Sequence, residues 1–205
     1  MIIIDSILDA EKQLDGIEAV IFDLDDTLYS EKDYVRSGYR AIAAGFPEVP
    51  DMAERLWTVF ERGGKAIDEV LEAEGLTSRR AEALHAYRYQ EPEIVLYPGV
   101  REMLDRLGST HRLGIITDGR SEGQRAKLRA LGLTHIETII TDELGGIEFR
   151  KPKDTAFRIM TERLGVPYSR AAYVGDNPAK DFIAPKALGM RSIYFVNPDG
   201  LYSGK

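Results

Sequence analysis

The chain has 205 residues, of which 43% are hydrophobic and 30% charged, a composition typical of a globular protein and unlike that of a disordered chain. It carries 27 Lys and Arg against 34 Asp and Glu, and this net charge of −7 argues against non-specific binding to nucleic acid or an anionic membrane. The absence of cysteine excludes disulfides, thiolate metal sites and cysteine nucleophiles.

The first residues and the apolar runs indicate the expected cellular environment. The start of the chain reads MIIID and lacks both the basic residues and the long apolar run of a signal peptide. No apolar run approaches the roughly 18 residues that a membrane span needs. We therefore expect a cytoplasmic protein with neither a membrane nor a nucleic acid as its partner.

Short apolar runs followed by polar residues recur along the chain. Runs of this kind are typical of strands that are buried on both faces of a parallel sheet. They occupy residues 19–22, 113–116, 138–140, 171–174 and 192–196. The alternation of these runs with amphipathic segments predicts an α/β protein, whose ligands gather at the carboxyl ends of the strands.

Three of the amphipathic segments predict helices. The region between the first two apolar runs predicts additional helices. The three helices are expected over residues 100–107, 121–131 and 155–164. Ser121 and Gln124 have the spacing of a capping box at the start of the second helix. Residues 30–95 contain helical stripes but no convincing strand, and they carry more acidic than basic residues. We therefore expect an all-helical insertion directly after the polar end of the first strand.

Carboxylates follow two of the predicted strands. Asp23 and Asp25 leave the first strand two residues apart, and Asp176 and Asp181 follow the fourth. If these strand ends are neighbours, the carboxylates repel one another, since two like charges about 4 Å apart cost roughly 4 kcal/mol at an effective dielectric near 20. A hard cation such as Mg²⁺, which prefers oxygen ligands, would offset this repulsion, and Lys151 can supply a fixed positive charge.

Four motifs in this order resemble those of the haloacid dehalogenase (HAD) superfamily of phosphohydrolases. Residues 22–28 read FDLDDTL and match the first motif, Asp-x-Asp-x-Thr. Thr117 matches the second motif, Lys151 the third, and Gly175-Asp176 with Asp181 the fourth. Each motif is weak alone, but four of them in sequence on strand ends are a specific signal.

The resemblance implies a fold and a domain organisation. The fold is a Rossmann-like parallel sheet, the HAD fold, with an all-helical cap of the C1 type inserted after the first strand. Residues 1–29 and 96–205 would form the α/β core and residues 30–95 the cap. The phosphoglycolate phosphatase-like branch of the family has this arrangement.

The resemblance also implies roles for the residues of the first two motifs. Asp23 would be the nucleophile that forms an aspartyl-phosphate, and Asp25 would be the general acid and then the general base. Thr117 would hydrogen-bond the transferring phosphoryl group, helped by the backbone N–H groups of Asp118 and Gly119.

The residues of the third and fourth motifs would offset the negative charge of the site, directly or by holding Mg²⁺. Lys151 would offset the negative charge of the nucleophile and the phosphate. Mg²⁺ would be held by the side chains of Asp23 and Asp176 and by the backbone carbonyl of Asp25. Asp181 would orient Lys151 or a metal-bound water rather than bind the metal directly.

The function that the resemblance implies is a Mg²⁺-dependent phosphatase acting on a small phosphorylated metabolite, such as a sugar phosphate, a nucleoside monophosphate or a phospho-acid. Asp25 argues against a dehalogenase, since the family's dehalogenases lack an aspartate at this position. A phosphomutase of the β-phosphoglucomutase type would use the same residues and is an alternative, and a non-enzymatic HAD-fold binding module is another. The sequence gives no indication of the oligomeric state.

Overall fold

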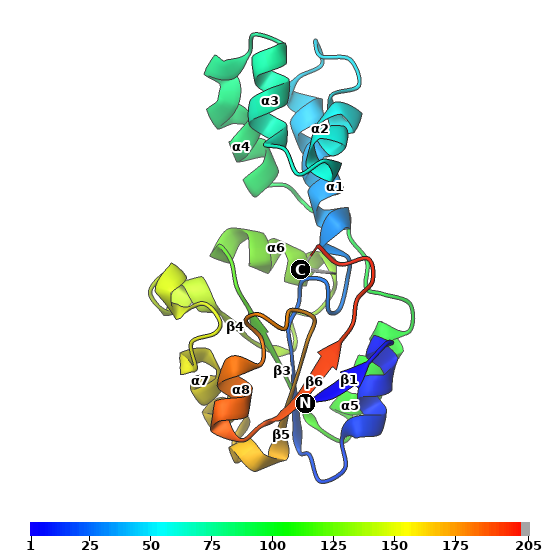
Figure 1. Cartoon of the computed structure of the whole chain (residues 1–205), viewed down its shortest axis with the longest axis vertical. Helices are drawn as coiled ribbons and strands as arrows, with labels where there is room; N and C mark the ends of the chain where they lie inside the picture. Colours follow the sequence, from blue (N-terminus) through cyan, green and yellow to red (C-terminus); the bar gives the residue numbers. More distant parts are fainter. Residues whose placement is uncertain (202–205) are drawn as a thin grey trace. The chain divides into compact units, whose positions relative to one another are not determined.

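The structure, a computed structural model, describes residues 1–201 of the chain. The chain divides into two compact units (Figure 1). One unit consists of Met1–Glu31 together with the chain from Val95 onward, and the other is Lys32–Ile94.

The first unit is built on a six-stranded sheet in the order β1-β6-β5-β2-β3-β4, and every pair of neighbouring strands is parallel. The predicted parallel α/β fold is therefore confirmed. The strands are β1 (Ile2–Ile4), β2 (Ala19–Phe22), β3 (Arg112–Thr117), β4 (Glu137–Ile140), β5 (Ala171–Gly175) and β6 (Arg191–Phe195).

Five of these strands correspond to the predicted apolar runs, whereas β1 was not predicted. It spans only three residues and pairs on one side alone, with β6. The side chain of Ile3 is 61% exposed, so the run does not have the buried character that identifies β2 and β5. Tertiary pairing rather than local pattern makes this segment a strand.

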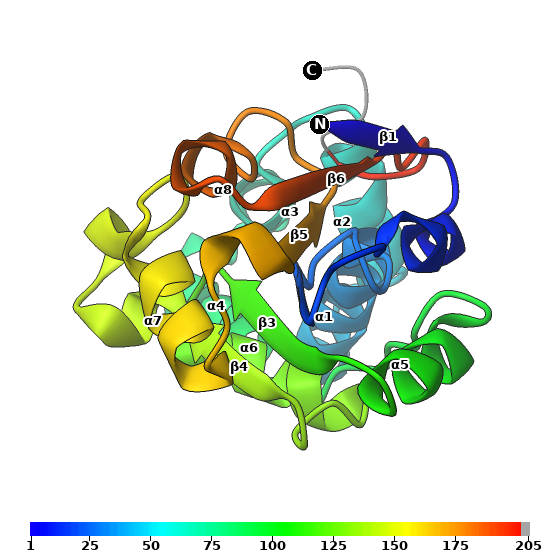
Figure 2. The same ribbon diagram turned by 90° about the horizontal axis from the view of Figure 1, so that it is seen from below.

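Helices cover both faces of the sheet, with α7 and α8 on one side and α5 and η1 on the other (Figure 2). The helices α5, α6 and α7 lie where the apolar periodicity predicts them. The α-helices of this unit are α5 (Val100–Gly108), α6 (Ser121–Ala130), α7 (Thr155–Leu164) and α8 (Ile183–Leu188). The 3-10 helices are η1 (Ile7–Gln13), η3 (Thr141–Leu144), η4 (Ile147–Phe149) and η5 (Tyr168–Arg170).

A fully buried cluster holds the centre of the sheet against α7. Ile21 of β2 and Tyr173 of β5 pack with Phe157 and Met160 of α7, and none of these four residues is exposed to solvent. Burial of each large apolar side chain contributes about 1.5–3 kcal/mol relative to its exposure. The adjacent strands β2 and β5 are therefore rigid supports for whatever follows them.

The direction of the chain reverses between these two strands. From β2 the chain proceeds outward to β3 and β4, and it then crosses back to β5 on the other side of β2 before reaching β6. In open parallel sheets, ligands bind beyond the carboxyl ends of the strands at such a reversal. A ligand site is therefore expected among the residues that follow β2 and β5.

The second unit is helical among its described residues and has a core of its own. Its core includes Ile42, Phe46, Leu56 and Leu71, each of which is almost completely buried. The elements are α1 (Glu31–Gly45), which begins in the first unit, α2 (Met52–Glu61), α3 (Ala66–Ala73), η2 (Thr77–Arg79) and α4 (Arg80–Arg88).

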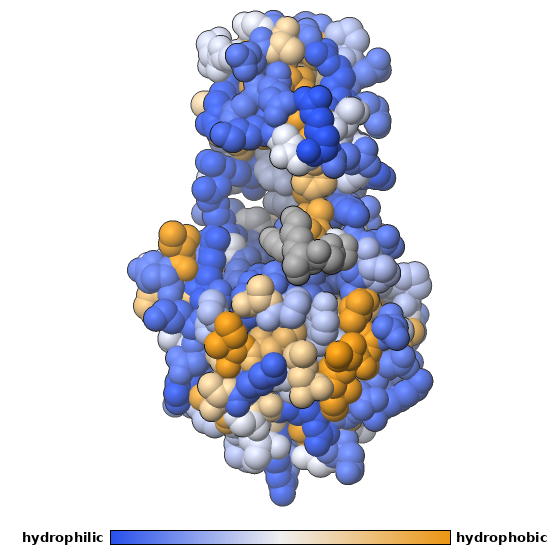
Figure 3. Space-filling model, viewed as in Figure 1, coloured by the Kyte–Doolittle hydropathy of each residue, from blue (hydrophilic) through white to orange (hydrophobic). Residues whose placement is uncertain are grey.

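The surface carries scattered apolar side chains. The face drawn in Figure 3 is largely hydrophilic, with separate apolar patches on the unit that contains the sheet. Exposed apolar residues of that unit include Ile3, Val95, Ile147 and Ile183. None of the helices within residues 1–201 has the length and apolar character needed to cross a membrane.

Candidate active site

The first residue after β2 and the first residue after β5 lie side by side because their strands are paired. The N–H of Asp23 donates to the carbonyl of Val174 at 2.8 Å, so the β2–β5 ladder continues through Asp23. Asp176 follows Gly175, the last residue of β5. The sheet therefore fixes the backbone of both aspartates.

The loop after Asp23 is held by contacts to the far end of the chain. Asp26 adopts a left-handed conformation with φ of 53°, which is unusual for a residue other than glycine. Its carbonyl accepts a hydrogen bond from the side-chain amide of Asn197 at 2.8 Å. Its carboxylate accepts the N–H groups of Glu31 at 2.8 Å and Leu201 at 2.7 Å. These bonds fix the turn at Asp26, directly after Asp25.

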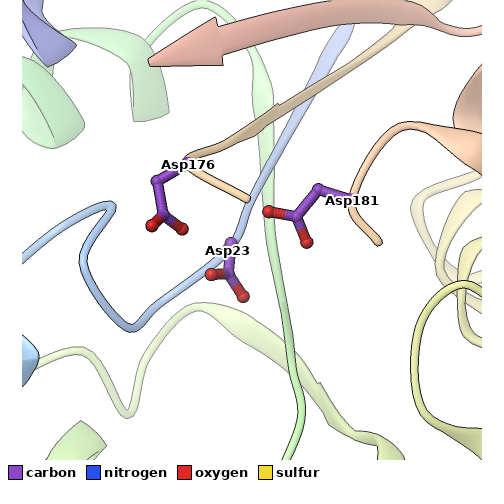
Figure 4. Close-up of side chains that lie close together, drawn as sticks. All are labelled: Asp23, Asp176 and Asp181. Carbon is purple, nitrogen blue, oxygen red and sulfur yellow. The ribbon is translucent and has the colours of Figure 1, made fainter. Parts of the chain in front are cut away.

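Three buried carboxylates meet beyond the strand ends (Figure 4). Asp23, Asp176 and Asp181 each place a carboxylate oxygen within 4.8 Å of the others. Burial and repulsion from Asp23 and Asp181 raise the pKa of Asp176 to about 8. Burial likewise raises the pKa of Asp23 to about 6, even though Lys151 acts in the opposite direction. The cluster therefore lacks positive charge.

Lys151 supplies part of that charge. Its ammonium contacts Asp23 Oδ1 at 2.5 Å and Asp181 Oδ1 at 2.8 Å, and it donates to the hydroxyl of Tyr173 at 2.9 Å. Burial alone would lower the pKa of Lys151, but the carboxylates of Asp181 and Asp23 outweigh burial and raise it well above its ordinary value. Lys151 is thus a permanent cation fixed beside Asp23.

The oxygens that remain suit a divalent cation. Both carboxylate oxygens of Asp181 are engaged, one by Lys151 and the other by the N–H of Asn177 at 2.9 Å. Asp176 accepts only a long hydrogen bond from Thr27, at 3.4 Å, among the contacts of residues 1–201. An all-oxygen donor set with excess negative charge fits Mg²⁺. The residues present therefore fit the metal that the sequence predicts.

The end of β3 provides hydrogen-bonding groups. Thr117 is fully buried, and its hydroxyl lies within hydrogen-bond distance of the side-chain amide of Gln124. The carboxylate of Asp118 is already engaged by the hydroxyl of Thr141 at 2.9 Å and the N–H of Lys151 at 3.1 Å. Asp118 can therefore contribute its backbone N–H rather than its side chain.

Asp25 lies apart from the carboxylate cluster. Its Oδ1 is paired with the ammonium of Lys127 at 2.6 Å and also accepts the hydroxyl proton of Tyr29. Its Oδ2 accepts a hydrogen bond from Gln124 at 2.8 Å. Burial would raise the pKa of Asp25, but the charge and hydrogen bond of Lys127 outweigh burial and lower it.

Sequence reasoning missed several residues around this site. Lys127 and Tyr173 were not predicted to take part, and neither was Lys180, whose ammonium lies 3.3 Å from Asp118 Oδ2. A signal for Lys127 was available, since it lies on the apolar side of α6 next to Leu128. A lysine at such a position needs a buried partner.

The predicted capping box at the start of α6 is wrong. The residue before the helix, Arg120, is the N-cap, and no side chain caps the helix. The hydroxyl of Ser121 donates instead to Glu143. In a capping box Gln124 would accept a backbone N–H, but its amide instead donates to the carboxylate of Asp25 at 2.8 Å, a charge-assisted hydrogen bond.

The comparisons with known proteins agree with this geometry. Residues 17–189 match the family model of the haloacid dehalogenase-like hydrolases. The chain belongs to this family. It is 29% identical to the glyceraldehyde 3-phosphate phosphatase of Methanocaldococcus jannaschii, over 86% of this chain and 84% of the relative. It is 31% identical to the glyceraldehyde 3-phosphate phosphatase of Methanopyrus kandleri, over 86% of this chain and 83% of the relative.

A comparison with solved structures shows a similar fold. A crystal structure of a HAD-superfamily hydrolase from Geobacter sulfurreducens superposes with a TM-score of 0.67 at 21% identity, covering 87% of each chain. At this identity the similarity shows the fold alone. Together with the family match, it confirms the expected HAD fold of this haloacid dehalogenase-like hydrolase.

Proposed function

We propose that this hydrolase is a Mg²⁺-dependent phosphatase that releases phosphate from a small phosphorylated metabolite through an aspartyl-phosphate on Asp23. The observation that carries the proposal is the carboxylate of Asp23, which is held by the buried ammonium of Lys151 and faces Asp176. The two relatives described above, which are both named as phosphatases, support the same class of reaction.

The first half of the reaction breaks the phosphate ester. A carboxylate oxygen of Asp23 attacks phosphorus, and the bond from phosphorus to the alcohol oxygen breaks. Lys127 keeps Asp25 ionised in the free protein, so Asp25 takes up a proton when the negatively charged phosphate ester binds. It then gives that proton to the leaving oxygen, so the alcohol leaves neutral. The hydroxyl of Thr117 and the N–H groups of Asp118 and Gly119 hold the equatorial oxygens, since phosphoryl transfer depends mainly on positioning and on charge stabilisation.

The second half regenerates the enzyme. Asp25 takes a proton from a water molecule, the water oxygen attacks phosphorus, and the bond between phosphorus and Asp23 breaks. Lys151 stays paired with Asp181 and offsets the charge on Asp23 and the phosphoryl group throughout. The side chains of Asp23 and Asp176 and the carbonyl of Asp25 would hold Mg²⁺, which would supply the positive charge that lets an anionic carboxylate approach an anionic phosphate.

The relatives indicate which substrates to test first. The names of the Methanocaldococcus and Methanopyrus relatives point to a three-carbon phosphate ester. Sugar phosphates, nucleoside monophosphates and other phospho-acids complete the panel, because differences in kcat/KM define a substrate.

The test is a phosphate-release screen on about a hundred phosphorylated metabolites with Mg²⁺, on wild type and the Asp23→Asn variant. We expect wild-type turnover to disappear in Asp23→Asn and after treatment with EDTA, and added Mg²⁺ to restore the chelated enzyme. Retained activity in either case contradicts the proposal. Isomerised hexose phosphate without inorganic phosphate would indicate a phosphomutase instead.

A further inference from the structure

Helix α6 directs two polar side chains into the interior of the sheet unit. Gln124 is 3% exposed and Lys127 is 5% exposed, although both residue types normally lie at the surface. They are three residues apart and therefore share one face of the helix. A buried lysine is costly unless its charge is paired, so the position of Lys127 needs an explanation.

Both side chains bind the carboxylate of Asp25. Lys127 holds Oδ1 at 2.6 Å, and Gln124 holds Oδ2 at 2.8 Å while also donating to the carbonyl of Asp118 at 2.8 Å. Tyr29 donates to Oδ1, and the Lys127 ammonium lies 5.9 Å from the centre of the Tyr29 ring. Both oxygens of this carboxylate are thus fixed by groups from two directions.

Stability alone does not account for this arrangement. Replacing a buried ion pair with well-packed apolar residues is often neutral or stabilising, so such a pair contributes little to stability by itself. A short carboxylate side chain can otherwise occupy several staggered rotamers. Proton transfer requires the carboxylate to lie within hydrogen-bond reach of the oxygen it serves. The three donors select one orientation for Asp25.

We propose that Lys127, assisted by Gln124, is a positioning residue that orients the Asp25 carboxylate for proton transfer. This inference rests on the proposed function, in which Asp25 protonates the leaving group and later deprotonates water. Neither side chain needs to touch the substrate. Their contribution is to keep the proton-transferring group in place through both halves of the reaction.

The test compares two leaving groups in the Lys127→Met variant at saturating Mg²⁺. The p-nitrophenolate of p-nitrophenyl phosphate leaves without a proton, so formation of the aspartyl-phosphate is spared and only its hydrolysis slows. We expect rapid release of about one p-nitrophenol per enzyme, followed by a slow steady state. An alkyl phosphate needs proton transfer in both halves of the reaction. For glyceraldehyde 3-phosphate, or whichever alkyl phosphate wild type hydrolyses fastest, we expect kcat to fall about 10- to 100-fold.

The controls separate positioning from folding. The KM for the alkyl phosphate should change less than about threefold, because Lys127 is not proposed to contact the substrate. Lys186→Met, which removes an exposed lysine of α8, should behave as wild type in every assay. Gln124→Met should show the same burst and the same loss of kcat on the alkyl phosphate as Lys127→Met, but to a smaller degree. If thermal unfolding shows that Lys127→Met does not fold, the Gln124→Met variant tests the inference in its place.

Two results overturn the inference. One is an equal fall in kcat on p-nitrophenyl phosphate and on the alkyl phosphate with no burst of p-nitrophenol, which indicates a structural role only. The other is wild-type kinetics in both Lys127→Met and Gln124→Met. Failure of the proposed function looks different, since wild type would then release no phosphate or Asp23→Asn would remain active.

Discussion

Replacing Asp181 with asparagine tests whether this carboxylate positions Lys151 or binds the metal. Asparagine has nearly the same shape as aspartate but lacks its charge. Asp181 is fully buried, and its two oxygens are engaged by the ammonium of Lys151 at 2.8 Å and the N–H of Asn177 at 2.9 Å. The substitution therefore removes one of the two carboxylates that hold Lys151.

The magnitude follows from these contacts. At 2.8 Å and an effective dielectric near 20, the gross attraction between Asp181 and Lys151 is roughly 6 kcal/mol. Relief of the buried charge offsets much of this, and Lys151 keeps its contact with Asp23 at 2.5 Å. We expect a net loss of about 1–3 kcal/mol in the free energy of unfolding. A similar loss in the transition state lowers kcat/KM about 10- to 100-fold, since 1.4 kcal/mol is a factor of ten.

The assay is a titration of activity with Mg²⁺ for wild type and Asp181→Asn, together with urea unfolding of both proteins. If Asp181 acts through Lys151, the Mg²⁺ concentration for half-maximal activity should change less than about threefold, well below the 10- to 100-fold typical when a residue that supports a metal site is removed. The reasoning is refuted if this concentration rises more than tenfold and saturating Mg²⁺ restores the wild-type rate, because Asp181 would then be a metal ligand.

Two glycines of the sheet give further predictions. In Gly175→Ala, the new Cβ would lie 2.5 Å from a carboxylate oxygen of Asp181, so we expect kcat to fall about 100-fold because the displaced carboxylate moves Lys151. A phosphate-release assay checks this, and a near wild-type rate would contradict it. In Gly114→Ala, the Cβ would lie 2.8 Å from the sulfur of Met160 in the core beneath the sheet, which is far enough from the site to spare kcat. Overpacking there should lower the free energy of unfolding by about 1–3 kcal/mol in urea denaturation, and an unchanged midpoint would argue against it.

Much of the sheet is predictable from the sequence because its central strands are buried on both faces. The apolar runs at β2 and β5 need no information from distant parts of the chain, and the following Asp23 and Asp176 are recognisable as polar residues after buried strands. The short edge strand β1 depends on its pairing with β6, which local pattern does not reveal. Local burial thus predicts the centre of the sheet better than its edge.

The carboxylate cluster was predicted on the condition that the two strand ends are neighbours, and the pairing of β2 with β5 meets that condition. The contacts around Asp25 were not predicted. The contacts of Lys127 and Gln124 depend on how α6 is rotated about its axis. The position of Lys127 on the apolar side of the helix indicates a buried partner, but the sequence does not identify Asp25 as that partner. The structure shows both side chains buried and bound to a carboxylate about a hundred positions earlier in the chain.

The bonds from Asn197 and Leu201 to Asp26 have a practical consequence for protein production. They couple the last described residues to the turn at Asp26, which directly follows Asp25 of the first motif. A shortened chain that stops before Asn197 would keep all six strands while releasing this turn, so it could fold and still be a poor catalyst. An affinity tag is therefore better placed ahead of Met1, where the neighbouring side chain of Ile3 already faces solvent.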